Sequence, residues 1–223
     1  MHQRKSKKIL IYFFLIIAIS SINNLSLNNL KLNNINDIKI SGLSKNENNI
    51  LFQEIKKMNL ENIFSINSNE ISHLIDTNSL IENYEVKKKY PSTIYIKIQK
   101  TKFYAKININ DETFLIGSNG KLSPNDFQNK DLPFIFGKPD IKEFLNFKNI
   151  IDQSKFSYDQ IENLYFYPSK RWDLKMKNNV LLKLSKNLTI EYLNDLYEFL
   201  GQDNIEQFTI VDARLKNQII LNE

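Results

Sequence analysis

An uninterrupted apolar segment near the N-terminus constrains this chain more than any other feature. Residues 9–22, ILIYFFLIIAISSI, contain no charged side chain, and they follow MHQRKSKK, which has four basic groups and no acidic one. A run that is apolar on all sides does not fit a surface helix of a soluble domain, and its flank is wholly basic. The segment therefore predicts that the rest of the chain is exported across a membrane.

Two interpretations of this segment remain open. At about 1.5 Å per residue it spans roughly 21 Å, or roughly 28 Å if it extends to Leu27, against a hydrocarbon core of ~30 Å. A transmembrane signal anchor over 9–27 would leave residues 1–8 as a cytoplasmic tail. A cleaved signal peptide is the alternative, because Ala18-Ile19-Ser20 fits a small-x-small cleavage site. We take the anchor as the working interpretation, with residues 28–36 as a polar linker.

Composition excludes several functional classes. The 30 basic and 25 acidic residues give a net charge of +5, and without the first eight residues 26 basic groups face 25 acidic ones. A nucleic-acid binder keeps a basic excess on its folded body, so nucleic acid is not an expected partner. The chain contains no cysteine, which excludes disulfide scaffolds, thiolate nucleophiles and thiolate metal sites.

Residues 37–103 predict a compact two-layer domain. Ile38 and Ile40 alternate with polar residues in a short strand, and two helical patterns follow. The first places Ile50, Leu51, Ile55 and Met58 on one face, and the second places Ile71, Leu74 and Ile75 on one stripe. Two strands complete the unit, in the second of which Ile94, Ile96 and Ile98 alternate. The order strand, helix, helix, strand, strand predicts two helices packed on a three-stranded sheet.

Three consecutive lysines, 87–89, stand between these last two strands, just before Tyr90-Pro91. They fit either a basic ribbon that lies on nucleic acid or a hairpin with a solvated charged end. The near-neutral body favours the hairpin.

Residues 104–223 predict a second, mainly antiparallel β domain with flanking helices. Expected strands include 161–167, 171–177 and 180–184, with a hairpin turn at Asn178-Asn179. Helices are expected over 140–151 and after Asn187, where Leu193, Leu196, Tyr197 and Leu200 form a stripe that Gly201 closes. Two short strands on either side of Lys216-Asn217 end the chain, the last over Gln218–Leu221.

The sequence contains no recognisable catalytic constellation. Apart from His2, the only histidine is His73, on an expected helix without a second ligand at usable spacing. No phosphate-binding glycine loop, paired-histidine motif or nucleophile elbow is present. The single tryptophan, Trp172, is most simply a core residue. We therefore predict a protein that is not an enzyme and has no cofactor, no metal site and no small-molecule substrate.

Several motifs in order resemble those of a known family. The first domain has the pattern of a POTRA domain: Gly42-Leu43, Ile50, Ile63-Phe64-Ser65-Ile66, Ile71, Val86 and Tyr90-Pro91-Ser92-Thr93-Ile94. The second has Leu132-Pro133-Phe134-Ile135-Phe136-Gly137, then Lys170-Arg171-Trp172-Asp173-Leu174, and finally Val211-Asp212-Ala213-Arg214. A tethered POTRA domain followed by such a β domain resembles the FtsQ/DivIB cell-division proteins over nearly the whole chain.

This resemblance implies a non-catalytic divisome scaffold at the septum, a single-pass type II protein of the bacterial inner membrane with the bulk of the chain in the periplasm. The implied partners are FtsB and FtsL, and the implied mode is addition of a partner strand beside the last β-strand. The positions at that contact fall on Lys170, Arg214, Leu215, Asn217, Gln218, Ile219 and Leu221. For Arg214, an internal salt bridge to Asp212 is an equal alternative. A different exported POTRA protein, for secretion or outer-membrane assembly, is the alternative function, and a cleaved periplasmic ligand-binding or enzymatic protein is the third.

Overall fold

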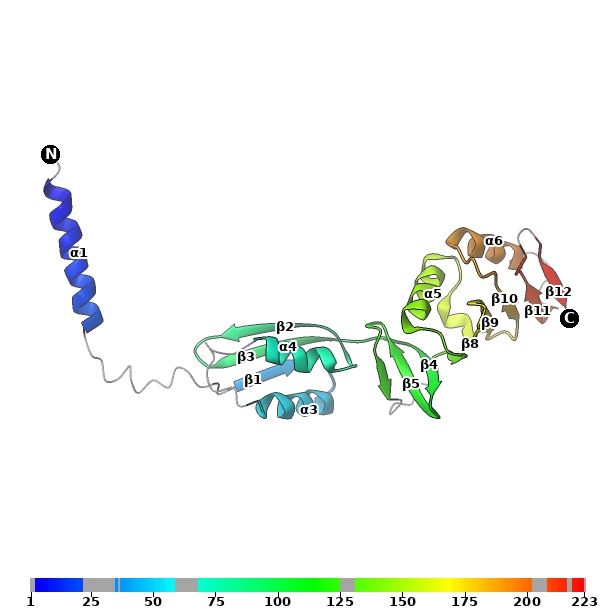
Figure 1. The fold of residues 1–223 in the computed structure, drawn as a ribbon, viewed down its shortest axis with the longest axis horizontal. Helices are drawn as coiled ribbons and strands as arrows, with labels where there is room; N and C mark the ends of the chain where they lie inside the picture. Colours follow the sequence, from blue (N-terminus) through cyan, green and yellow to red (C-terminus); the bar gives the residue numbers. More distant parts are fainter. Residues whose placement is uncertain are drawn as a thin grey trace.

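The computed structural model describes residues 3–21, 35, 37–58, 68–124, 131–201, 208–215 and 218–222. An N-terminal helix, α1 (Gln3–Ser21), precedes a small α/β domain and a larger β-rich domain (Figure 1). The large apolar side chains of α1 between Ile9 and Ile19 are 44–68% exposed. In the described ranges, no helix has both the length and the apolar character needed to cross a membrane. The predicted anchor extends to residue 27, and its part from 22 to 27 lies outside the described residues.

The first domain has the predicted order of elements. It consists of β1 (Asp37–Ser41), α3 (Lys45–Lys56), α4 (Ser68–Thr77), β2 (Ile81–Lys89) and β3 (Thr93–Lys100). β3 is the central strand, with β1 parallel to it on one side and β2 antiparallel on the other. The motif segment 63–66 lies outside the described residues, as does most of the predicted linker.

The core of this domain lies between the sheet and the two helices. Ile94, Ile96 and Ile98 of β3 are at most 5% exposed, and they pack with Leu51 and Ile55 of α3 and with Ile71 and Ile75 of α4. The predicted helical face is wrong at one position, because Ile50 is 61% exposed. Leu51 and Ile55 are four residues apart and share one face of α3, whereas Ile50 lies about 100° away from Leu51 around the axis.

The second domain is built on a nine-stranded sheet. Its strands are β4 (Phe103–Ile109), β5 (Glu112–Gly117), β6 (Leu122–Pro124), β7 (Phe134–Phe136), β8 (Ile161–Phe166), β9 (Trp172–Met176), β10 (Leu181–Lys183), β11 (Ile210–Asp212) and β12 (Ile220–Asn222). Their spatial order is β12-β11-β10-β9-β8-β7-β4-β5-β6, and five of the eight pairings are antiparallel. The predicted boundary between residues 103 and 104 falls one residue inside β4.

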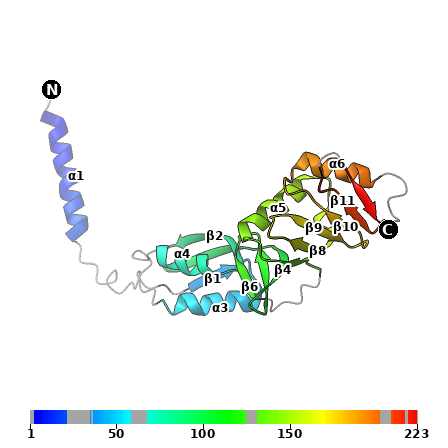
Figure 2. The same cartoon turned by 45° about the vertical axis from the view of Figure 1, so that its right-hand side comes forward.

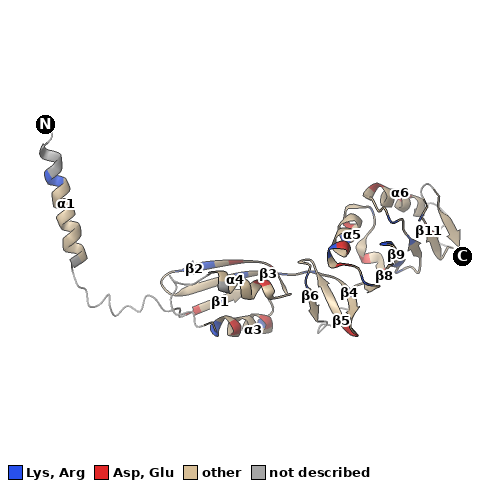
Figure 3. Cartoon of the chain, viewed as in Figure 1, with Lys and Arg blue, Asp and Glu red and all other residues tan. Residues whose placement is uncertain are grey.

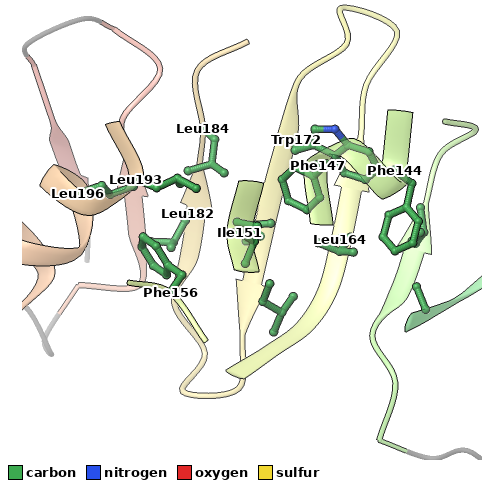
Figure 4. Packing of buried hydrophobic residues seen from close by; sticks show 14 of the residues in the cluster. Phe144, Phe147, Ile151, Phe156, Leu164, Trp172, Leu182, Leu184, Leu193 and Leu196 are labelled. Atoms are coloured by element: carbon green, nitrogen blue, oxygen red, sulfur yellow. The ribbon is translucent and has the colours of Figure 1, made fainter. Parts of the chain in front are cut away.

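Three helical elements accompany this sheet: α5 (Ile141–Gln153), the short 3₁₀ helix η1 (Tyr158–Gln160) and α6 (Ile190–Leu200). Phe144, Phe147 and Ile151 of α5 and Leu193 of α6 are buried in one core with the strands (Figure 4). The stripe predicted for α6 is wrong at Tyr197, which is 46% exposed and meets Phe156 in an edge-on ring contact.

Trp172 is the central aromatic residue of this core. It is 6% exposed, its ring stacks on Phe147 at 4.5 Å between centroids, and Phe166 lies at 4.7 Å (Figure 4). Offset aromatic packing of this kind adds to the burial of the rings themselves. The interpretation of Trp172 as a core residue is confirmed.

Side chains of the β5–β6 turn connect the two domains. Asn119 donates to the backbone carbonyls of Ser79 (3.1 Å) and Ile81 (2.8 Å), just before and within β2. Lys121 Nζ donates to the carbonyls of Asp76 (2.5 Å) and Asn78 (3.2 Å) at the C-terminal end of α4. A cation at this position also interacts favourably with the negative end of the helix dipole. The β5–β6 turn therefore caps α4 from the neighbouring domain. Figure 2 shows the two domains from a second direction.

Candidate partner-binding edge

The strand β12 lies at one end of the nine-stranded sheet, and β11 is its neighbour. Val211 is paired with Leu221, and Asp212 with Ile220. In the part of the chain that the structure describes, no strand is paired with the other side of β12. The backbone groups on such an edge are available for pairing with another chain.

The position of β12 differs from the predicted last strand. The sequence predicts Gln218–Leu221, whereas β12 covers Ile220–Asn222. Ile219 and Leu221 both pack against the core, and Ile220 between them is 44% exposed. This alternation fixes which side chains of the edge face solvent, because a shift by one residue would exchange the two sets.

Arg214, one of the predicted contact residues, forms an ion pair with Asp212. Its Nε lies 2.8 Å and 2.9 Å from the two carboxylate oxygens, and Nη2 lies 2.5 Å from Oδ2. Hydrogen bonds from the Arg214 side chain are the main cause that lowers the pKa of Asp212, and the pKa of Arg214 is raised by the same contact. The internal salt bridge expected as an alternative is thus present in the free chain, and the Arg214 side chain remains 44% exposed.

A groove lies between α6 and the segment that leads into β12. Its volume is about 360 Å³, and it is lined by Tyr192, Leu196, Phe199, Leu215, Gln218 and Ile219, with Asp195 and Ala213 at its sides. Leu215 is 57% exposed beside it. Tyr192 connects the two walls, because its hydroxyl donates to the carbonyl of Ala213 at 2.5 Å.

Lys170 lies in the turn between β8 and β9, three strands away from β12 in the sheet. It is exposed, with a φ of 61°, and its N–H donates to the carbonyl of Tyr167. The neighbouring Arg171 packs on the ring of Tyr167 at 4.3 Å and binds the buried carboxylate of Asp173 at 3.1 Å. Asp173 is paired with Lys183 of β10, and Lys183 is paired with Asp212 of β11, so this cluster lies two strands away from Asp212.

The predicted site is therefore brought together in part. Arg214, Leu215, Gln218, Ile219 and Leu221 lie on or beside the β11–β12 edge, whereas Asn217 lies outside the described residues. Two features were missed by the sequence: the groove along α6, and the Arg171–Asp173 pair. For the pair a signal exists, since an arginine and an aspartate two residues apart on a strand lie on the same face.

Within the described ranges, no three histidine, aspartate or glutamate side chains gather in a way that would hold a metal ion.

The chain thus combines a small βααββ domain with a β-rich domain whose sheet ends at β12. Comparison with known proteins shows which proteins this chain is similar to. Residues 33–100 match the model of the FtsQ-type POTRA domain. The chain is 27% identical over 183 residues to the cell division protein FtsQ of Rickettsia bellii, and 24% identical over 180 residues to that of Rickettsia prowazekii.

Each of these matches covers 72% of this chain and 61% of the relative, so the chain spans about three fifths of the length of the curated relatives it matches. A solved structure, the major extracytoplasmic domain of the division protein DivIB from Geobacillus stearothermophilus, matches 45% of this chain and 92% of that chain, with a TM-score of 0.35 and 12% identity. The match to the FtsQ-type POTRA model and the two curated relatives confirm the resemblance to FtsQ cell-division proteins.

Proposed function

We propose that this chain is a non-catalytic scaffold of the bacterial division machinery that binds FtsB, and through it FtsL, by adding a strand of FtsB to β12. The observation that carries the proposal is the place of β12 at the end of the sheet. Strand addition uses backbone hydrogen bonds for affinity and alternate side chains for specificity. The groove beside Leu215 and Ile219 supports such specificity, because it offers an apolar surface to a side chain of the added segment.

The proposal places the chain in the inner membrane as a single-pass type II protein, with both domains in the periplasm. Its support is the character of α1, whose apolar side chains are exposed along the whole segment from Ile9 to Ile19. Lys7 and Lys8 precede this segment, and basic residues at the start of an apolar helix favour a cytoplasmic N-terminus.

A pair of substitutions tests strand addition. Leu221→Pro removes a backbone donor from the open side of β12, because the pairing of Asp212 with Ile220 turns the donor of Ile220 toward β11, whereas Leu221→Val keeps the donor. In a binding assay with the periplasmic segment of FtsB, we expect Leu221→Pro to abolish binding and Leu221→Val to retain it.

Circular dichroism of both variants controls for folding. Equal binding by two folded variants would refute strand addition at β12. Cysteine cross-linking from position 220 gives an independent readout, since this chain contains no cysteine of its own. Strand addition predicts cross-links to every second residue of the FtsB segment, because side chains of a strand alternate between the two faces.

A further inference from the structure

The turn between β2 and β3 lies at the end of the POTRA domain where the chain arrives from α1. Asp37, the first residue of β1, is paired with Thr93, the first residue of β3. Its N–H also points to the carbonyl of Ser92 at 3.4 Å. Figures 1 and 2 both show this turn beside the start of β1 and far from the second domain. We call residues 87–92 the hairpin tip.

The distance between the hairpin tip and α1 has an upper bound. Residues 22–36 connect Ser21 to Asp37, and fifteen residues span at most roughly 50 Å when fully extended. The opposite end of the POTRA domain is held by Asn119 and Lys121 of the second domain. The hairpin tip is therefore the end of this domain that faces whatever surface holds α1.

Basic side chains gather at this end of the sheet. Lys87, Lys88 and Lys89 end β2, and Lys39 of β1 lies at the level of Lys87, since both are paired with Tyr95 of β3 (Figure 3). The register brings two acidic residues to the same strands, and each pairs with a lysine: Asp37 with Lys39 at 3.4 Å, and Glu85 with Lys87 at 2.9 Å. On the described strands at this end, four lysines against two carboxylates leave an excess of two positive charges, on a body that is otherwise near neutral.

An exposed aromatic residue completes the hairpin tip. Tyr90 is 57% exposed, directly after the three lysines, and Pro91 next to it is exposed as well. Tyrosine combines an apolar ring with a polar hydroxyl, which suits the boundary between lipid headgroups and acyl chains. Lysines next to an interfacial tyrosine match the chemistry of an anionic lipid surface.

We propose that the hairpin tip contacts anionic phospholipid headgroups of the same membrane that holds α1. The inference rests on the proposed anchoring of α1. The connection through residues 22–36 favours lipid over a soluble polyanion as the partner, because it keeps the hairpin tip at a high effective concentration next to the bilayer. Each lysine near an anionic bilayer contributes about 1 kcal/mol, and hence about fivefold in the equilibrium between contact and release.

The test uses the full-length chain in vesicles of phosphatidylcholine alone and in vesicles that also contain phosphatidylglycerol. A single cysteine at Ser92 carries an environment-sensitive fluorophore, and the vesicles contain a lipid with a headgroup quencher. A cysteine at Lys45, at the start of α3 and away from the tip, gives the comparison site. A cysteine at Ile16 reports separately whether α1 is embedded.

We expect quenching at position 92, but not at position 45, to increase with phosphatidylglycerol and to decrease with added salt. Lys87→Gln with Lys89→Gln should weaken the contact about fivefold for each lysine removed. Lys138→Gln with Lys142→Gln removes the same charge from exposed positions of the second domain and should leave quenching unchanged.

Three outcomes would overturn the inference while the label at Ile16 is shielded. The first is equal quenching at positions 92 and 45, and the second is equal quenching in the two kinds of vesicle. The third is quenching that survives the loss of both lysines, because the connection to α1 alone would then account for it. A label at 92 that ignores phosphatidylglycerol but responds to an oligonucleotide would favour the nucleic-acid ribbon. An unshielded label at Ile16 refutes the anchor itself.

Discussion

At the scale of single residues, Asp212 and Arg214 form an ion pair beside the β11–β12 edge, and this pair stabilises the fold. The hydrogen bonds from Arg214 hold the pKa of Asp212 below its ordinary value of 3.8. The folded state therefore binds this proton more weakly than the unfolded chain does, so the pair stabilises the fold above the unfolded pKa. This contribution is lost as the pH falls through the depressed pKa of the folded state.

Removal of Arg214 tests this electrostatic coupling. In Arg214→Gln the guanidinium is lost, so the pKa of Asp212 should rise towards 3.8. A pH titration of the Asp212 carboxyl carbon by NMR measures this change directly. Asp173→Asn serves as the matched control, because Asp173 is bound chiefly to Arg171 and should leave most of the shift at Asp212 in place. An unchanged titration in Arg214→Gln would contradict the assigned cause.

Trp172 gives a second prediction at this scale, now about the core. Trp172→Ala removes a buried ring that contacts Phe144, Phe147 and Phe166, and such truncations cost about 3–5 kcal/mol. Denaturant unfolding followed by circular dichroism measures the free energy of unfolding. Tyr197→Ala, at a position 46% exposed, should cost less than about 1 kcal/mol. Similar losses in the two variants would argue against Trp172 as the centre of the packing.

At the scale of elements, strands with a long alternating hydrophobic pattern were predicted more accurately than short ones. Ile94, Ile96 and Ile98 alternate along a strand of eight residues, so the sequence was sufficient to place β3 and the POTRA order around it. β11 and β12 have only three residues each, too few to define a period. The sequence placed the start of the last strand two residues too early and its end one residue too early. The groove along α6 needs contacts between distant residues, which no local pattern contains.

The start of α3 provides a prediction for a single element. Ser44 and Glu47 form a reciprocal capping box, and Glu47 also binds Lys100 of β3 at 2.8 Å. Loss of an N-cap serine costs about 0.5–2 kcal/mol, so Ser44→Ala should destabilise the POTRA domain by that amount. Amide hydrogen exchange should show the loss first in the opening turn of α3. Ser44→Asp keeps a capping oxygen and should retain protection; equal exchange in the two variants would refute the cap.

At the scale of the whole molecule, the β5–β6 turn decides whether the two domains move as one body. Its side chains Asn119 and Lys121 donate to backbone carbonyls about 40 residues earlier in the chain, at the end of α4 and the start of β2.

Asn119→Ala with Lys121→Met removes these four hydrogen bonds and keeps the apolar stem of the lysine. Nitroxide labels on cysteines at Lys45 and Lys142, one in each domain, should give a narrow distance distribution in the native chain and a broad one in the variant. Lys102→Met, at an exposed position of the same junction, is the matched control and should stay narrow. If the distribution keeps its width in the double variant, the remaining hydrogen bond from Ser118 to Glu82 and the two-residue connection between β3 and β4 are sufficient to orient the domains. A broad distribution would mean that these contacts fix the angle between the two domains. Under the two proposals above, the turn would then set how far from the bilayer β12 binds a partner strand.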